Sequence, residues 1–171
     1  SLNNASGQIV ADGNLSIKTG DLLNTESGLL SSQGQFKIES VNIDNQGVIQ
    51  AQQQLDIINT GHLAKVKGVI SSQNNINIQS QSLNSDAQSA IAAGLNSKGD
   101  IDKNQAANLN IKTQQNLNSH GQLLASQNID LTASQLDLSQ GLVSADQVDI
   151  TAQSGSINNQ AGRIQAKDLQ L

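Results

Sequence analysis

The sequence predicts an all-β protein, a right-handed parallel β-helix (solenoid) of about eight coils of about 20 residues with one loop insertion. Three observations lead to this prediction. Glycine recurs at a nearly constant spacing, apolar residues follow each glycine in fixed register, and apolar residues within a copy alternate with a period of two. The right hand is the general preference of parallel crossover connections.

A glycine marks seven of the eight copies. These glycines are Gly7, Gly28, Gly47, Gly68, Gly121, Gly141 and Gly162, and their spacing is nearly constant except for one long gap after Gly68. Two positions after each glycine lies an aliphatic residue, and two positions further lies Ala or Ser. Ile91 follows Ile70 at the usual spacing and marks the eighth copy inside the long gap. A polar chain that keeps this register is unlike a disordered one.

Each copy continues with two apolar residues separated by one position. The pairs are Leu15/Ile17, Phe36/Ile38, Leu55/Ile57, Ile76/Ile78, Leu109/Ile111, Ile129/Leu131, Val148/Ile150 and Leu169/Leu171. This period is that of a strand. Each copy also opens with an aliphatic residue that is usually followed by Asn or Asp, as in Leu23-Asn24. We therefore expect two or three short strands per coil, with aliphatic columns inside and an Ala/Ser column where two walls approach closely.

Composition excludes several classes of protein. No apolar run approaches the roughly 18 residues of a membrane span, so no membrane insertion is expected. A net charge of −5 and a single aromatic residue, Phe36, argue against binding to nucleic acid. The first ten residues lack the pattern of a signal peptide. We therefore expect residues 1–171 to be a single repeat array, a fragment of a longer filament.

The repeated unit G-x-[IL]-x-[AS]-x3-[LF]-x-[IL] resembles the filamentous haemagglutinin repeats of bacterial two-partner secretion exoproteins, and so does the stretch SAIAAGLNSKGDIDKNQAANLNI, residues 89–111. This family includes adhesins and contact-dependent growth inhibition proteins. The resemblance implies secretion through a dedicated outer-membrane transporter, a location at the bacterial cell surface, and a role as an adhesin or toxin-presenting stalk. It assigns no catalytic residue and no cofactor.

One copy is longer than the others. The step from Ile91 to Leu109 is three times as long as the corresponding step from Ile9 to Leu15 in the first copy. Residues 94–107 are therefore expected to leave the fifth coil as a loop. The loop is either a structural excursion or a recognition element for a receptor on a target cell or host, and Leu95 and Ile101 could anchor it on the coil wall. The candidate recognition residues are Leu95, Asn96, Lys98, Asp100, Asp102, Lys103 and Asn104.

The position directly after each glycine, which should point outward, is apolar in four successive coils. These residues are Leu29, Val48, Val69 and Ala90. Exposed strands favour such residues for their β-propensity alone. The alternatives are a lateral stripe for association, or a patch that the insertion covers.

Catalysis is the rival class of function. Asp56, Asp130 and Asp149 occupy the outward position between the two apolar residues, where a carbohydrate-active β-helix enzyme would place carboxylates. Such an enzyme also needs aromatic residues and a basic partner, and the only arginine is Arg163. The three aspartates are therefore interpreted as solvated wall residues.

Metal binding has little support in the sequence. Asp100, Asp102 and Asn104 match the beginning of a calcium loop, but Gln105 replaces its glycine and Ile111 its bidentate glutamate. His62 and His120 have no companion His or Cys nearby. No metal or catalytic role is expected for any of them.

Overall fold

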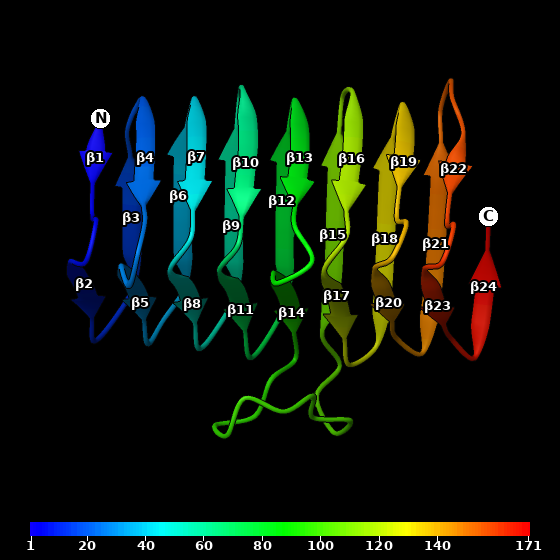
Figure 1. Ribbon diagram of the computed structural model, residues 1–171. Helices are drawn as coiled ribbons and strands as arrows, with labels where there is room; N and C mark the ends of the chain where they lie inside the picture. The colour runs from blue at the N-terminus through cyan, green and yellow to red at the C-terminus, as the bar shows by residue number, and fades with distance from the viewer.

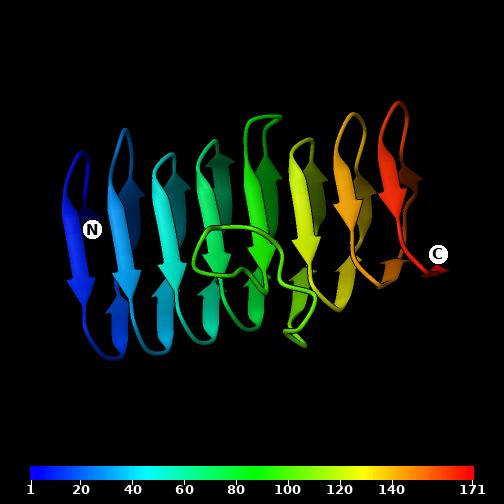
Figure 2. The same cartoon turned by 90° about the horizontal axis from the view of Figure 1, so that it is seen from below.

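The computed structural model describes residues 1–171 apart from the side chains of residues 64 and 65. Its 24 described strands form eight coils of three strands each, and no described segment is a helix, so no helix long and apolar enough to cross a membrane is found (Figure 1). Coil n contains the nth strand of each of three sheets, in which neighbouring coils pair in parallel. The two chain ends lie at opposite ends of the rod (Figure 2). The prediction of a parallel β-solenoid is confirmed, with three strands per coil.

Sheet A opens each coil. Its strands are β1 (Leu2–Asn3), β4 (Asp21–Asn24), β7 (Asn42–Asn45), β10 (His62–Val66), β13 (Ser82–Ser85), β16 (Asn116–Ser119), β19 (Gln135–Asp137) and β22 (Ile157–Asn158). The expected register is wrong in the second coil, because Leu22 and not Leu23 pairs with Leu2 and Ile43. Leu22 is fully buried, whereas Leu23 is 37% exposed. Adjacent leucines satisfy either register locally, and stacking on the neighbouring coils selects one.

Sheet B follows each glycine position. Its strands are β2 (Gln8–Ala11), β5 (Leu29–Ser32), β8 (Val48–Ala51), β11 (Val69–Ser72), β14 (Ala90–Ala93), β17 (Gln122–Ala125), β20 (Leu142–Ser144) and β23 (Arg163–Gln165). The expected small column is buried at Ser32, Ala51, Ser72, Ala93, Ala125 and Ala145.

Sheet C completes each coil. Its strands are β3 (Leu15–Lys18), β6 (Phe36–Ser40), β9 (Leu55–Asn59), β12 (Ile76–Ser80), β15 (Asn108–Thr113), β18 (Asn128–Ala133), β21 (Gln147–Ala152) and β24 (Asp168–Gln170). Both residues of each apolar pair point inward along most of the rod, and Phe36 lies fully buried between Leu15 and Leu55. The core is therefore a set of continuous aliphatic columns.

The close approach of successive coils explains the column of glycines. The N–H of the residue after a glycine usually donates to the glycine carbonyl one coil earlier, as from Val48 to Gly28 at 2.9 Å, and Gln122 donates instead to Ser89, which takes the glycine position of coil 5. A Cβ atom at Gly47 would collide with the carbonyl oxygen of Gly28, and one at Gly68 would collide with that of Gly47. Steric exclusion, and not a left-handed backbone, thus requires glycine here.

A polar ladder runs inside the first three coils. Asn4 Nδ2 donates to Asn24 Oδ1, and Asn24 Nδ2 donates to Asn45 Oδ1, each at 2.8 Å. All three side chains are buried. Val66, where the pairing of β10 with β13 shifts register, takes the next place in this column. The sequence pattern placed Asn or Asp directly after the aliphatic residue, as in Leu2-Asn3 and Ile43-Asp44, whereas the buried amides of Asn4 and Asn45 lie one position later.

Candidate functional site

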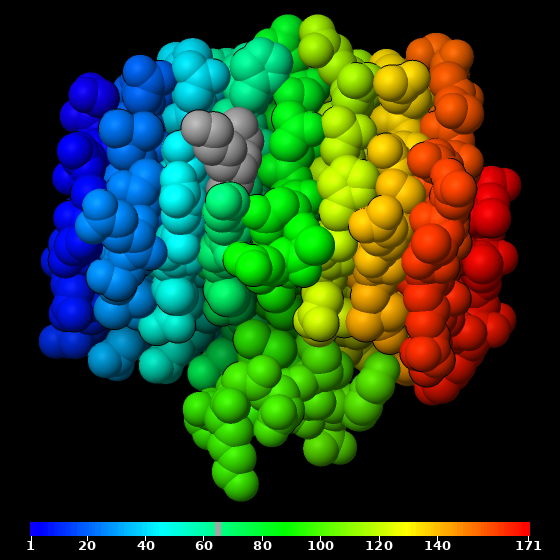
Figure 3. All heavy atoms as spheres, in the orientation of Figure 1, coloured from blue at the N-terminus to red at the C-terminus, as the bar shows by residue number. Residues whose placement is uncertain are grey.

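The insertion joins β14 to β15 and projects from one side of the rod (Figures 1 and 3). Ile91 keeps its place between Ile70 and Leu123, and Leu109 keeps its place between Ile76 and Ile129. The coils on both sides are therefore continuous through the region where the chain leaves the wall. Seen from below, the insertion lies across several neighbouring coils (Figure 2).

Both ends of the insertion are built into the wall. Gly94 is buried with a φ of +82°, and Ala107 is 1% exposed. A Cβ atom at Gly94 would lie 2.7 Å from the Cβ of Ser126 and 3.0 Å from that of Ala107. Glycine is thus required by the left-handed backbone and by lack of space together.

The first half of the insertion is a small hairpin that is organised by Asn96. The Asn96 side-chain oxygen accepts hydrogen bonds from the N–H groups of Lys98 and Asp100, at 2.8 and 3.0 Å. Its own N–H donates to the Asp100 carbonyl at 2.8 Å. Leu95 and Ile101 form an antiparallel bridge with each other, and each is half-buried.

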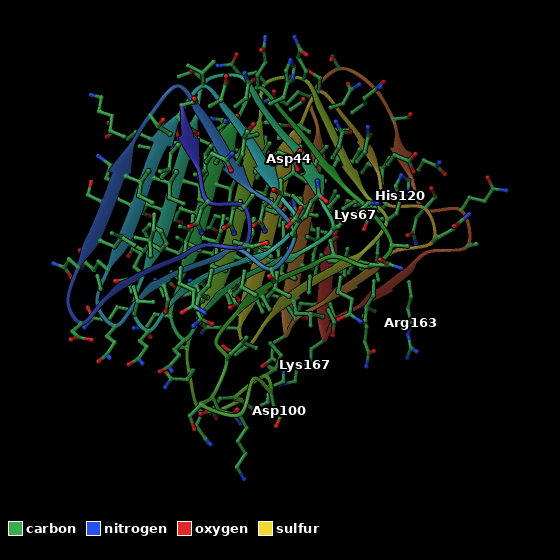
Figure 4. The ribbon with its side chains drawn as sticks, turned by 60° about the vertical axis from the view of Figure 1, so that its left-hand side comes forward. Asp44, Lys67, Asp100, His120, Arg163 and Lys167 are labelled. Atoms are coloured by element: carbon green, nitrogen blue, oxygen red, sulfur yellow. The ribbon has the colours of Figure 1, made fainter. Side chains whose placement is uncertain are left out.

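The second half is organised by Asp102 in the same way. Its carboxylate accepts hydrogen bonds from the N–H and the side-chain amide of Asn104, at 2.9 and 3.1 Å. The Asp102 N–H donates to the Gly94 carbonyl at 2.8 Å, which closes the base of the hairpin. Asp100 is exposed on the projecting part of the insertion (Figure 4). Asn96 and Asp102, both candidate recognition residues, thus have a role in shaping the loop.

Lys103 connects the insertion to the wall two coils away. Its Nζ lies 3.0 Å from Asp146 Oδ1, and Lys167 Nζ lies 3.0 Å from Asp146 Oδ2. The hydrogen bond from Lys103, followed by that from Lys167, holds the pKa of Asp146 below its usual range. Asp146 is therefore the common partner of two cations on the surface of the rod.

A groove separates the hairpin from the outer face of sheet B. It has a volume of about 540 Å³ and is lined by Val48, Val69, Leu95 and Lys98, among others. Val48 and Val69 belong to the apolar stripe of the sequence analysis, while Leu29 and Ala90 lie half-exposed beside them. Part of the stripe therefore forms one wall of a groove under the insertion.

The carboxylates of the enzyme hypothesis lie on a different wall. Asp56, Asp130 and Asp149 point outward from sheet C, and Asp56 accepts hydrogen bonds from Gln54 and Asn77. A shallow hollow of about 500 Å³ on this face includes Asp56 and Asp130. Arg163 begins β23 in sheet B and therefore lies on a different wall (Figure 4). The structure does not bring the carboxylates and the arginine together.

The two histidines make local contacts. His62 Nδ1 lies 2.6 Å from Ser82 Oγ. His120 Nδ1 lies 2.8 Å from the Ser139 carbonyl oxygen, so this nitrogen carries the proton and cannot also accept one from the Ser139 hydroxyl. Hydrogen bonds from Ser139 hold the pKa of nearby Asp137 below its usual range. His120 Nδ1 therefore does not serve as the base that would activate Ser139. Within the described residues, no three His, Cys, Asp or Glu side chains are grouped to hold a metal ion.

The rod of repeated coils, with its continuous inner columns, defines the class of protein: a β-solenoid repeat array. The haemagglutinin repeat family model matches residues 1–64, 37–102, 103–147 and 138–171, and the chain belongs to this family. It is 32% identical over 152 residues to Toxin CdiA of Yersinia pestis. The alignment covers 87% of this chain but only 4% of that relative's length. No solved structure matches the chain.

Proposed function

We propose that this chain is a non-catalytic filament segment of a secreted adhesin or contact-dependent toxin-delivery exoprotein. The observation that carries the proposal is the continuity of the columns through eight coils, including the coil with the insertion. At about 4.8 Å per coil, eight coils span roughly 35–40 Å. Such an array separates two points in space with little bending, which is the task of a stalk.

The family supplies the cellular setting of this proposal. Membership of the haemagglutinin repeats and the similarity to Toxin CdiA support an exoprotein at the bacterial surface. In this setting the full-length protein has an outer-membrane two-partner-secretion transporter as its partner. The chain itself needs no cofactor for a mechanical role.

A second function, recognition of a receptor, is favoured by the insertion. Its hairpin is held in one conformation by Asn96, and its tip, residues 97–100, is exposed beside the groove. A preorganised loop loses less conformational entropy on binding than a flexible one. The lack of aromatic and arginine side chains in the insertion counts against a strong binding site.

One exchange experiment tests the stalk directly. In the full-length protein, residues 1–171 are replaced by eight coils from another part of the same filament. Surface display is measured with an antibody, and adhesion to target cells is measured in parallel. A stalk predicts that both are retained. Loss of adhesion with display intact would refute the stalk proposal and favour receptor recognition.

A second variant locates recognition within the segment. Ser97, Lys98 and Asp100 are changed to glycine, with Gly99 and both ends of the insertion preserved. The matched control changes three exposed positions on sheet C, at residues 79, 110 and 112, to serine. Selective loss of adhesion in the first variant would support recognition by the hairpin. Equal adhesion of the two variants would rule it out.

A further inference from the structure

We infer that the insertion is an axial strap that fastens coils 4 to 7 to one another from outside. This role is independent of the proposed function and does not require a receptor. Elsewhere in the solenoid, backbone pairing joins each coil only to its immediate neighbours. The strap adds connections that run beyond the next coil.

The strap is fastened to coil 4 by its first residues. Gly94 N–H continues the regular ladder to the Ser72 carbonyl at 2.9 Å, and Leu95 N–H donates to the same oxygen at 3.1 Å. Ser71 of coil 4 and Ala92 of coil 5 alternate with the inward-pointing residues of sheet B, yet they are only 7% and 4% exposed. The equivalent Gln50 in coil 3 is exposed. The insertion therefore leaves the coil and also folds back over the outer face of sheet B.

Coil 6 holds the other end through a single buried hydroxyl. Ser126 is 2% exposed, and its Oγ donates to the Gln105 carbonyl at 2.7 Å while it accepts from the Ala107 N–H at 3.1 Å. Both partners belong to the returning half of the insertion. Because the Ala107 N–H is buried, loss of this hydroxyl leaves it without a replacement partner.

Coil 7 is reached by a side chain that passes over coil 6. Lys103 Nζ lies 3.5 Å from the Ser126 carbonyl oxygen and 3.0 Å from the Asp146 carboxylate. Asp146 also binds Lys167 of coil 8. Coil 5 is thus connected to a coil that is not its neighbour.

The consequence concerns cooperativity. In a quasi-one-dimensional array, a coil opens according to its own stability and its two interfaces. A connection between coils 5 and 7 makes the opening of coil 6 depend on both of them. We therefore expect coils 4 to 7 to open as one unit, while the exposed hairpin tip stays outside that unit.

Hydrogen exchange measured by mass spectrometry on the 171-residue chain tests this. Ser126→Ala should accelerate exchange about tenfold throughout β11, β14, β17 and β20, because the buried Ala107 N–H loses its hydrogen-bond partner. Its control is Ser32→Ala, which removes a buried hydroxyl that donates to Gly13 O at 2.7 Å, far from the insertion. That change should accelerate exchange only around coils 1 to 3. If Ser126→Ala affected only coil 6 and its two neighbours, coils 5 and 7, as the control affects only coils 1 to 3, the strap would be refuted.

A surface variant avoids any risk to folding. Lys103→Met removes the connection to Asp146 and should accelerate exchange in β17 and β20 by up to about fivefold at low salt. High salt should reduce the difference, because solvent reaches both charges and screens their interaction. Lys98→Met makes the same charge change in the same loop, on a side chain with no ion pair among the described contacts. Equal exchange in the two variants at low salt would overturn the proposal.

Discussion

Asn24 and Asn45 are joined inside the solenoid by a hydrogen bond from Nδ2 to Oδ1 of 2.8 Å that crosses from one coil to the next. Asn24 also accepts from Asn4 and donates to the Val48 carbonyl at 3.2 Å. Its side chain therefore pairs with polar groups of the preceding and the following coil and links three successive coils. A buried ladder of this kind specifies the register of stacking, because a slipped coil would leave amides without partners.

Asn24→Ala should lower the free energy of unfolding by about 2–3 kcal/mol, since it leaves the buried Asn45 Oδ1 without its donor and removes one hydrogen bond of the Asn4 amide. Thermal or denaturant unfolding of the 171-residue chain measures the effect. Asn110→Ala removes an exposed amide that donates to Asn77 at 2.8 Å and should cost less than about 1 kcal/mol. Equal losses of unfolding free energy in the two variants would show that the internal ladder stabilises the fold no more than an exposed amide pair does.

Gly47→Ala should destabilise the fold by about 3 kcal/mol, because its Cβ would be forced against the Gly28 carbonyl and the coils would have to move apart. Gly13 has no atom within 4 Å of an added Cβ. Gly13→Ala should therefore change stability by less than about 1 kcal/mol. Denaturant midpoints of the two variants provide the comparison, and a tolerated Gly47→Ala would contradict the steric explanation of the glycine column.

Gln140→Gly should stabilise the chain by about 0.5–1 kcal/mol, because Gln140 has a φ of +60°, a conformation that strains a residue with a Cβ but not glycine. The gain is reduced by the greater freedom of glycine in the unfolded chain. Gln122→Gly, in β17, carries the entropic cost without relief of strain and should be destabilising. A lower melting temperature for both variants would argue against strain at residue 140.

Low pH should weaken the connection of the strap to coil 7 through Asp146. The pKa of Asp146 is lowered from its ordinary value of about 3.8 by Lys103 and Lys167, so its ionised form is favoured in the folded chain. The stabilisation is present above the ordinary pKa and is lost as the pH falls through the lowered one. Faster exchange in β20 than in β5 on acidification below about pH 4 is the expected result. Asp146→Asn should remove this difference between the two strands.

The register of the repeats accounts for the parts of the fold that the sequence predicted correctly. The glycine and aliphatic spacings predicted the coil number, the inward columns of sheets B and C, and the small column at Ala51 and Ala125. In sheet A, Leu22 and Leu23 both fit the repeat spacing, and local alternation could not choose between them. The sequence also could not predict that Ser126 and Asp146 lie beside the insertion. Ser and Asp occur at many other positions of the chain, and nothing in the local sequence distinguishes these two.

The sequence by itself determined that this chain is a stack of β-coils with one enlarged turn. Its repeats are long enough to pair but too short to fold alone, so stacking follows from composition and spacing. Only the tertiary structure decided which Asn side chains point inward, and that the insertion folds back over its neighbours instead of standing free. Those outcomes depend on contacts between residues that lie one or two coils apart, as from Lys103 to Asp146, and such contacts have no local signature in the chain.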